Sequence, residues 1–256
     1  MKRLLPAVFS LVCVLLLLSA CGRQREAETT VSIVLTKPDG SLIRSESEEV
    51  AGSESTEDAL GRLVKKFADA SGNIVISAKH GSEAQFETRG KLLAGKSEGT
   101  FETHAFIIDK RTNLRIKTLA QDYKDDVRHG RMVSYFPDGT IGNEGSWRNG
   151  KKQGVWTINA MKFRPAMIVT FEDGVLHGEA RIFTPTGAIL CQGVYQHGKP
   201  VEGSFLDDLW NFTSASARLE ESFDARLLRF KDGQQVDSTP VTVETGIDRA
   251  RPRSWR

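Results

Sequence analysis

The side chains of this sequence best suited to metal binding or proton transfer are its five histidines. Imidazole is a common zinc ligand and titrates near neutral pH, so clustered histidines would indicate a metal site or a general base. His129 and His177, however, occupy the same position of a sequence repeat, and His197 precedes another repeat glycine. Because repeat position explains this spacing, we expect no metal ion, no cofactor and at most a weak response to pH.

Nucleophilic and acid–base catalysis also find little support in the residue patterns. There is no glycine-flanked serine elbow, and Cys191 lies in an expected strand, where we interpret it as a small packed residue. The acid pairs Asp125-Asp126 and Asp207-Asp208 lie beside expected turns, where solvated acids are common. The glycines match neither phosphate-loop pattern. We therefore expect no catalytic residues.

A leader with a distinctive end occupies residues 1–20. Its apolar run, Leu4 to Leu18, is too short for a comfortable membrane span but suits a secretion signal. The run closes on Leu18-Ser19-Ala20-Cys21, which resembles the lipobox of bacterial lipoproteins. The resemblance implies cleavage before Cys21 and a diacylglycerol on its thiol. Two or three acyl chains anchor firmly, because each buried methylene adds about 0.8 kcal/mol. We expect Cys21 to attach the chain to a membrane.

The residues after this cysteine indicate where the chain goes. In enteric-type cells, lipoproteins without aspartate after the cysteine usually move on to the outer membrane, and here the next residue is Gly22. The resemblance thus implies a lipid-anchored protein of the cell envelope, on the outer membrane and facing the periplasm if the cell is Gram-negative. Residues 21–30 are polar and predict a lipidated, flexible tether.

Composition limits the remaining possibilities. The chain has 35 basic and 33 acidic residues, and removal of Lys2 and Arg3 with the leader leaves a formally neutral protein with no argument for nucleic-acid binding. Of three cysteines, Cys13 leaves with the leader and Cys21 is acylated, so Cys191 has no intramolecular disulfide partner. The mature length suits one large or two modest domains.

A glycine repeat organises the middle of the chain. Gly130, Gly154 and Gly178 are 24 residues apart, and Gly203 follows after 25. We interpret each as part of a paired-glycine hairpin turn, in which glycine supplies the positive backbone angle that other residues resist. The repeat turn glycines are Gly95, Gly99, Gly130, Gly150, Gly154, Gly174, Gly178, Gly198 and Gly203.

An aromatic residue precedes three of these turns by three positions: Trp147, Phe171 and Tyr195. A lone hairpin cannot bury such rings, whereas hairpins stacked in series can bury on the order of 150–250 Å² for each. We therefore expect the three rings to form one structural ladder.

These units resemble the MORN repeat, in particular its bacterial variant found in envelope and antitoxin-like proteins. The clearest copies are Glu144 to Trp156 and Gln192 to Lys199. The resemblance implies a mainly β fold, an elongated single-layer repeat of stacked β-hairpins over residues 81–210. Thr157 to Thr170 departs from the pattern because it lacks a turn glycine, and the second Gly-x-Gly typical of eukaryotic units is missing.

Before the repeats, residues 31–80 predict a hairpin and a helical cap. The hairpin turns at Pro38-Asp39-Gly40, and the polar stretch 45–57 reads as a loop. Apolar residues from Leu60 to Phe67 follow helical spacing, with Ser55 and Asp58 as a capping box and Gly72 as the stop. One short helix should pack on the first hairpins and protect the open end of the sheet.

After the repeats, residues 211–256 predict further strands and a basic tail. The strands, within 217–230 and 241–243, flank a turn at Asp232-Gly233. The last eight residues hold four arginines and no acid. A basic tail can contact anionic lipid or polysaccharide, but we expect this end to be disordered.

The function most consistent with these patterns is a non-enzymatic binding or scaffold lipoprotein that contacts a protein partner of unknown identity. An immunity or antitoxin-like role, in which the partner is a toxin, is the alternative implied by the resemblance. An envelope hydrolase, whose Asp, Glu and His residues would converge only on folding, is the least favoured.

Overall fold

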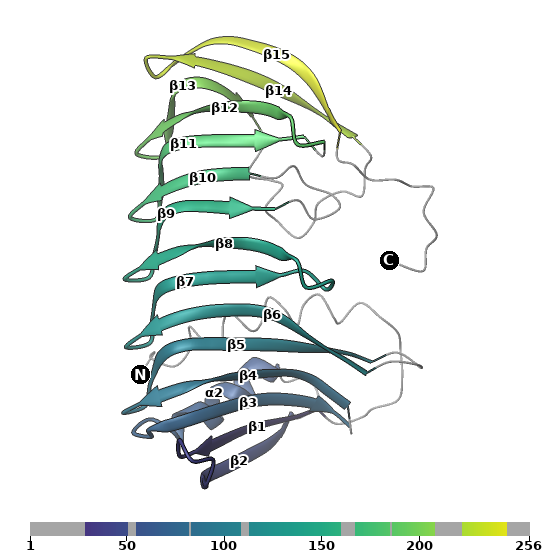
Figure 1. The fold of residues 1–256 in the computed structure, drawn as a ribbon, viewed down its shortest axis with the longest axis vertical. Helices are drawn as coiled ribbons and strands as arrows, with labels where there is room; N and C mark the ends of the chain where they lie inside the picture. Colours follow the sequence, from purple (N-terminus) through teal and green to yellow (C-terminus); the bar gives the residue numbers. More distant parts are fainter. Residues whose placement is uncertain are drawn as a thin grey trace. The chain divides into compact units, whose positions relative to one another are not determined.

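The computed structural model describes residues 29–50, 55–81, 83–108, 113–159, 167–184, 186–207 and 222–244. Within these ranges the chain forms fifteen β-strands and one α-helix, which confirms the expected mainly β fold with one short helix. The chain divides into two compact units, before and after residue 140. Each unit is a single-layer antiparallel sheet in which strands follow one another as hairpins (Figure 1).

The first unit is a seven-stranded sheet in the order β7-β6-β5-β4-β3-β1-β2, so β2 forms its edge. Apart from β2, which leaves β3 to pair with β1, each strand of this unit pairs with the next strand along the chain, because short connections join antiparallel neighbours. The strands are β1 (Thr29–Thr36), β2 (Leu42–Val50), β3 (Gly72–His80), β4 (Glu83–Leu93), β5 (Lys96–Ile108), β6 (Asn113–Lys124) and β7 (Val127–Tyr135).

Helix α2 (Thr56–Lys65) packs its apolar side on one face of this sheet. Ser55 caps it, since its hydroxyl accepts the Asp58 N–H at 3.1 Å, as the sequence pattern predicts. Leu60 and Leu63 are at most 1% exposed and lie in a cluster with residues of β1, β3 and β4. The helix thus supplies the second layer of the core in this unit, and it covers a face of the sheet instead of its open edge.

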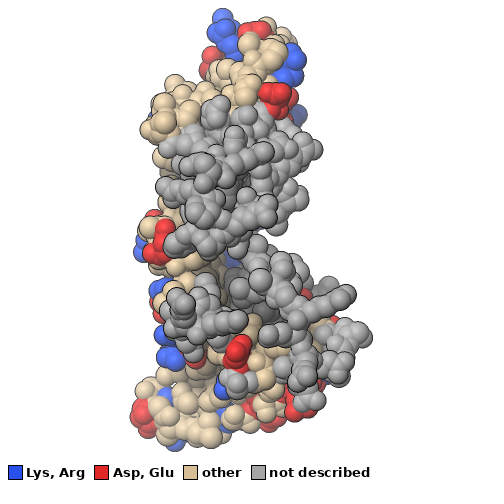
Figure 2. All heavy atoms as spheres, turned by 90° about the vertical axis from the view of Figure 1, so that its right-hand side faces the viewer, with Lys and Arg blue, Asp and Glu red and all other residues tan. Residues whose placement is uncertain are grey.

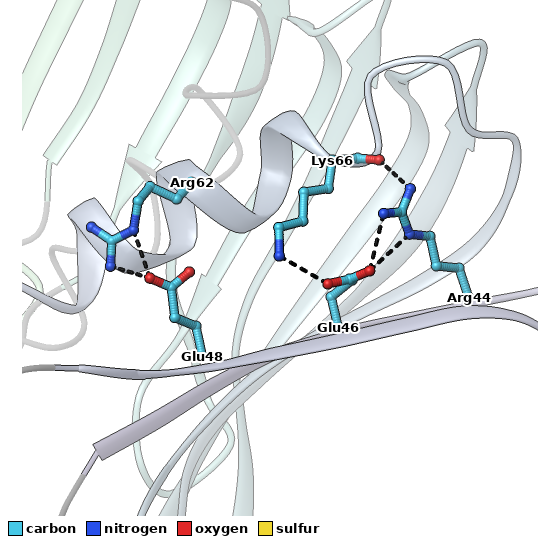
Figure 3. A network of polar contacts seen from close by, with 5 residues as sticks. All are labelled: Arg44, Glu46, Glu48, Arg62 and Lys66. Atoms are coloured by element: carbon cyan, nitrogen blue, oxygen red, sulfur yellow. Dashed lines mark hydrogen bonds and ion pairs between the residues drawn. The ribbon is translucent and has the colours of Figure 1, made fainter.

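Ion pairs join the polar side of α2 to the edge strand (Figure 3). Glu48 accepts a hydrogen bond from Arg62 at 2.6 Å, and Glu46 accepts one from Lys66 at 2.9 Å. Arg44 bonds both Glu46 and the Lys66 carbonyl oxygen. Lys66 and Arg44 lower the pKa of Glu46 below its ordinary value.

Two local predictions in this region are wrong. Residues 45–50 are not a loop: they belong to β2 and pair with β1 along their length. Their serines and glutamates suit a strand at an edge, where only one side is paired and charge opposes further pairing. Gly72 does not end the helix, which stops at Lys65; it begins β3 instead.

The second unit is an eight-stranded sheet in the order β15-β14-β13-β12-β11-β10-β9-β8. The turn predicted at Asp232-Gly233 joins its last two strands, and β9 pairs with β10 although Thr157 to Thr170 lacks a turn glycine. The strands are β8 (Ile141–Arg148), β9 (Lys151–Ile158), β10 (Met167–Glu172), β11 (Val175–Phe183), β12 (Ile189–Gln196), β13 (Lys199–Leu206), β14 (Ser222–Lys231) and β15 (Gln234–Glu244).

Two-residue turns close six hairpins, and both turn residues have positive φ in each. This is the type I′ geometry, whose twist matches that of the flanking strands and which favours Asn-Gly and Asp-Gly. The turns are Ala94-Gly95, Asp125-Asp126, Asn149-Gly150, Asp173-Gly174, His197-Gly198 and Asp232-Gly233.

The second glycine of each predicted pair does not lie in the turn. It lies inside the following strand, with φ between +69° and +108°, at the shift of strand register or, for Gly203, two residues after it. Such an interruption is a β-bulge, which needs an unusual backbone angle and bends the strand. The glycines at bulges are Gly99, Gly130, Gly154 and Gly178, whereas Gly203 pairs with Gly193 just after the bulge of its strand.

Turn amides join successive hairpins within each unit. In the second unit, the Gly174 N–H donates to the Lys152 carbonyl at 2.9 Å and the Gly198 N–H donates to Leu176 at 2.8 Å. In the first, the Asp126 N–H donates to Ser97 at 3.2 Å. The repeat of 24 residues therefore corresponds to one hairpin whose turn is bonded to the strand after the preceding turn.

Candidate binding surface

The three predicted ladder rings lie at equivalent places on β8, β10 and β12, which are not neighbours in the sheet. Trp156, from the strand after the turn, stands between Trp147 and Phe171, with ring centroids 5.5 and 6.1 Å away. Both contacts are edge-to-face, the geometry that aromatic quadrupoles favour. Trp156 is 3% exposed and Trp147 is half-buried, so Trp156 is the more deeply packed of the two.

A second set of rings surrounds Tyr195. Phe205 lies 4.8 Å from Tyr195 and 5.7 Å from Phe230, again edge-to-face. Between the two sets, Ala180 takes the position that Trp156 and Phe205 hold in their hairpins, and a cavity of about 10 Å³ borders it. Instead of the expected single ladder, the rings form two sets, one around Trp156 and one around Phe205, and the small side chain of Ala180 lies between them.

Glycines make room for the aromatic rings on the strands that follow the turns. A Cβ atom at Gly145 would lie 2.2 Å from the Trp156 ring, and one at Gly193 would lie 2.2 Å from Phe205. In the first unit, a Cβ atom at Gly90 would lie 2.4 Å from the Phe101 ring. Their φ angles are not positive, so an unusual backbone angle is not the reason for glycine at these positions. Glycine is needed because a Cβ atom would overlap the ring.

The polar face of the first unit carries a set of charged side chains on three neighbouring strands, β4, β5 and β6. Buried Phe86 and Thr88 alternate along β4 with exposed or half-buried residues of the opposite face. His104 of β5 pairs across the sheet with Glu87 on one side and Lys117 on the other. We call the following set the charged row: Glu87, Arg89, Glu102, His104, Arg115 and Lys117.

Hydrogen bonds and ion pairs connect the charged row. Glu87 accepts from Arg89 at 2.7 Å and from Arg115 at 2.8 Å, and Lys117 bonds Glu102. The Lys117 ammonium also lies 5.5 Å from the Tyr135 ring centroid, within cation–π range. Acidic and basic side chains thus lie next to one another on three neighbouring strands.

The charged row shifts the ionisation of its members. Burial lowers the pKa of His104, and the Arg115 charge lowers it further, so the imidazole is neutral at physiological pH. Burial tends to raise the pKa of Glu87, but Arg89 and Arg115 outweigh it and hold the pKa below its ordinary value. Hydrogen bonding from Lys117 lowers the pKa of Glu102. The row therefore offers fixed charges and one neutral imidazole.

Figure 2 shows the surface that faces the viewer when Figure 1 is turned by 90°. On its described part, Lys and Arg side chains are interspersed with Asp and Glu. This mixture agrees with the nearly equal numbers of basic and acidic residues in the sequence, 35 and 33.

The predicted repeat histidines lie in the second strands and turns of their hairpins. His177 and His197 stack edge-to-face with centroids 5.1 Å apart, and His177 Nδ1 lies 3.6 Å from a Glu172 oxygen. The described residues contain no group of three or more His, Cys, Asp or Glu side chains arranged to hold a metal ion.

Cys191 is a packed residue, as predicted. It lies on β12, is 4% exposed and borders the cavity beside Ala180. Burial raises the pKa of its thiol to about 11, so the reactive thiolate is scarce at neutral pH. Burial likewise raises the pKa of Tyr195, to about 12.

The acid pair Asp125-Asp126 forms a turn instead of lying beside one. Lys96 bonds Asp125 at 2.7 Å and lowers its pKa. Asp126 is 5% exposed and one oxygen accepts the Ser97 N–H at 2.6 Å, while its other oxygen has no hydrogen-bond partner. Burial raises the pKa of Asp126 above its ordinary value. Asp207 follows β13, and Asp208 lies outside the described residues.

The predicted lipidation site Cys21, the leader 1–20, most of the tether 21–30 and the basic tail also lie outside the described residues. Over the part of the chain that the structure does describe, no helix is both long and apolar enough to cross a membrane.

The charged row was not anticipated from the sequence. Its signal was present, because polar residues at Glu87 and Arg89 alternate with Phe86 and Thr88, the period-2 pattern of a two-faced strand. The rings of Phe101, Trp156 and Phe205 also had a signal, since each follows the second glycine of a repeat pair by two residues.

By its fold, the chain belongs to the class of mainly β proteins built from successive hairpins in single-layer sheets. No protein-family model matches the chain, and a comparison with curated proteins finds no relative. The resemblances to lipoproteins and to MORN repeats accordingly stay predictions.

Proposed function

We propose that this protein is a membrane-anchored, non-enzymatic binding protein of the cell envelope. Cys21 carries the lipid anchor, and the charged row on β4, β5 and β6 contacts a protein partner. The observation that supports the binding surface most directly is the cross-strand set of Glu87, His104 and Lys117, held level with one another by strand register. A partner surface with complementary charges would bind side chains that are already ordered, which limits the entropy lost on binding.

Several features favour a binding surface over a catalytic one at this place. Glu87, Glu102, Arg115 and Lys117 are engaged in ion pairs with one another, so none is an uncommitted base. They project from a sheet face, which presents an area suited to a macromolecule. Positioning by a rigid sheet also suits recognition better than positioning by loops.

A photocrosslinking experiment tests the proposal. A photoreactive amino acid replaces Arg89, whose side chain is 59% exposed, and the control places it at Val236, 60% exposed on β15. Illumination of intact cells should give one discrete crosslinked protein from position 89 and none from position 236. Equal crosslinking from both positions, or turnover of a substrate by the purified protein, would count against a binding role.

Mass spectrometry of the crosslinked product identifies the partner. A toxin as the partner would mean that the protein serves the immunity role, the alternative form of the same binding function. A charge-reversed Glu87→Lys chain should lose the crosslink at position 89 while remaining in the membrane fraction.

A further inference from the structure

Strand β2 leaves one side of the first sheet open (Figure 1). It pairs with β1 along its length, and no described strand pairs with its other side. The N–H and C=O groups on that side form a template for another strand. In the second unit the edge strand β15 contains Pro240, which has no N–H to donate. Strand β2 contains no proline, so its open edge is not blocked in this way.

Acidic side chains limit what can pair with this edge. Figure 3 shows Glu46 and Glu48 pointing from β2 toward α2, where Lys66 and Arg62 bond them. Arg44 lies on the same face, because residues two apart along a strand project to one side. A strand that placed further acids opposite these glutamates would be repelled, since like charges directly opposite each other destabilise a sheet. The edge therefore selects a partner strand whose charges are complementary.

Strand β2 is complementary to a second copy of itself. When two β2 strands run antiparallel with Glu46 opposite Glu46, Arg44 of each copy lies opposite Glu48 of the other. Leu42, which is 63% exposed in the single chain, then lies opposite Val50. Two-fold symmetry makes each of these pairs occur twice. Opposite charges and apolar pairs across strands both stabilise a sheet, so this register is favourable on the face that carries α2.

The centre of this pairing brings two carboxylates together. Each Glu46 carries its own counter-charges, because Lys66 bonds it at 2.9 Å and Arg44 bonds it at 3.0 Å. The two carboxylates therefore meet among cations, which offset their repulsion. On the opposite face of the strand Ser45 lies opposite Ser47, where two hydroxyl groups can hydrogen-bond. Neither face of β2 therefore opposes the pairing.

Neighbouring registers fit less well. A shift of one residue puts side chains of opposite faces together. A shift of two residues one way places Glu46 opposite Glu48 twice, and the other way places Leu42 opposite Glu48. The register centred on Glu46 also pairs every residue of β2. Its mismatched pair, Ile43 with Glu49, lies on the face away from α2, where the carboxylate stays exposed.

We propose that two copies of this chain pair antiparallel through β2, with Glu46 on the two-fold axis, and join their first units into one sheet. Strand register places Ser47 of β2 on the same face as Glu87 of the charged row. The two-fold axis is perpendicular to the sheet, so the pair presents both charged rows on one side. A partner with two binding sites would be held at both, which strengthens binding without new contacts. The pairing does not depend on the proposed lipid anchor.

Charge-swapped chains test the pairing. The full-length Arg44→Glu chain places a carboxylate opposite Glu48, and the Glu48→Lys chain places an ammonium opposite Arg44. Analytical ultracentrifugation in detergent should show that each chain alone dimerises more weakly than the wild type, by roughly tenfold or more. An equimolar mixture should recover wild-type dimerisation, because the new glutamate then faces the new lysine and Arg44 faces Glu48.

Lys79→Glu is the control, because this lysine is exposed on the interior strand β3, and its chain should dimerise as the wild type does. A monomeric wild type overturns the inference. Dimerisation that neither swap weakens also overturns it, because another surface then joins the copies. A loss in each swapped chain that the mixture does not recover overturns it as well, since complementary charges then do not govern the pairing.

Cysteines that lie opposite each other test the register. A mixture of Ser45→Cys and Ser47→Cys chains, oxidised with copper phenanthroline, should give a disulfide-linked dimer, because directly opposite residues are within reach of a disulfide. Either chain alone should give far less, and comparable dimer from one of them overturns the register. A disulfide to another protein in intact cells overturns the pairing of two copies, because a foreign strand then occupies the edge. Cys191 is 4% exposed, so the wild type gives the background.

Discussion

At the scale of single residues, packing in the second unit depends on glycines placed under aromatic rings. Gly145 lies beneath Trp156, whose ring also contacts Trp147 and Phe171 and lies 4.6 Å from the Lys152 ammonium. The ring therefore has little freedom to move away from an added methyl group. Replacement of Gly145 should therefore disturb the contacts of Trp156 with both Trp147 and Phe171.

Gly145→Ala should lower the free energy of unfolding by roughly 1–3 kcal/mol, because its Cβ would overlap the Trp156 ring. Gly61→Ala is the control: that glycine lies in α2 with open space around its Cβ, so alanine should raise stability by about 0.5–1 kcal/mol. Urea unfolding of both variants measures the two effects. A Gly145→Ala chain with the same free energy of unfolding as the wild type would mean that Trp156 is not held as described.

Asp126 gives a residue-level dependence on pH. Burial raises its pKa, so the folded chain binds this proton more tightly than the unfolded chain. The stability from this group is present at acid pH and is lost as pH rises through the raised pKa. Asp126→Asn should therefore stabilise the protein at pH 7 by on the order of 1 kcal/mol, with a gain that shrinks toward pH 4.

Asp125→Asn is the matched control for this effect, because both asparagines suit the positive φ of the turn. Lys96 lowers the pKa of Asp125, so its contribution is present at neutral pH and is lost as pH falls through the lowered pKa. The two variants should change stability at pH 7 in opposite directions. Unfolding curves at several pH values measure both changes in stability. A change in the same direction for both variants at pH 7 would contradict this account.

Residue spacing predicted Trp147, Phe171 and Tyr195 but missed the rings between them. The reason is the bulge: the strand after each turn carries extra residues, so Trp156 and Phe205 fall out of phase with a simple count from the turn. Ala180 hides the pattern further, because it places no ring in the intervening hairpin.

At the scale of elements, α2 is held mainly by its apolar side. Leu63 is fully buried against the sheet, whereas the Arg62–Glu48 pair on the neighbouring side is exposed, with a side-chain exposure of 45% for Arg62. Exposed pairs contribute little because water screens them and ordering two long side chains costs entropy. The ion pairs of Figure 3 therefore orient the helix more than they stabilise it.

Leu63→Ala should cost about 2–5 kcal/mol, and Arg62→Ala at most about 1 kcal/mol. The two residues are adjacent in one helix, so differences in helix propensity are small and burial decides the outcome. Thermal and urea unfolding distinguish them. Equal losses would assign the stability of α2 to its charges.

The sequence predicted α2 well because a capping residue and helical spacing agree in it. It failed for residues 45–50 because serine and glutamate have low strand propensity, and an edge strand needs no alternating apolar residues. Pairing with β1, a tertiary effect, decides their conformation.

At the scale of the whole molecule, the repeat predicted the single-layer sheets but not their division into two units. Spacing counts residues between turns and holds no information about which hairpins form a compact unit. The charged row was missed for a related reason: it depends on strand register, which brings Glu87, His104 and Lys117 level.

The central claim is that the protein works while held at a membrane through Cys21. Its most direct test is metabolic labelling with a radioactive fatty acid, followed by fractionation of cells producing the wild type or Cys21→Ala. The account predicts a labelled wild type in the membrane fraction and an unlabelled Cys21→Ala chain, since that chain lacks the thiol proposed to carry the lipid. An unlabelled wild type, or equal labelling of both chains, would contradict it.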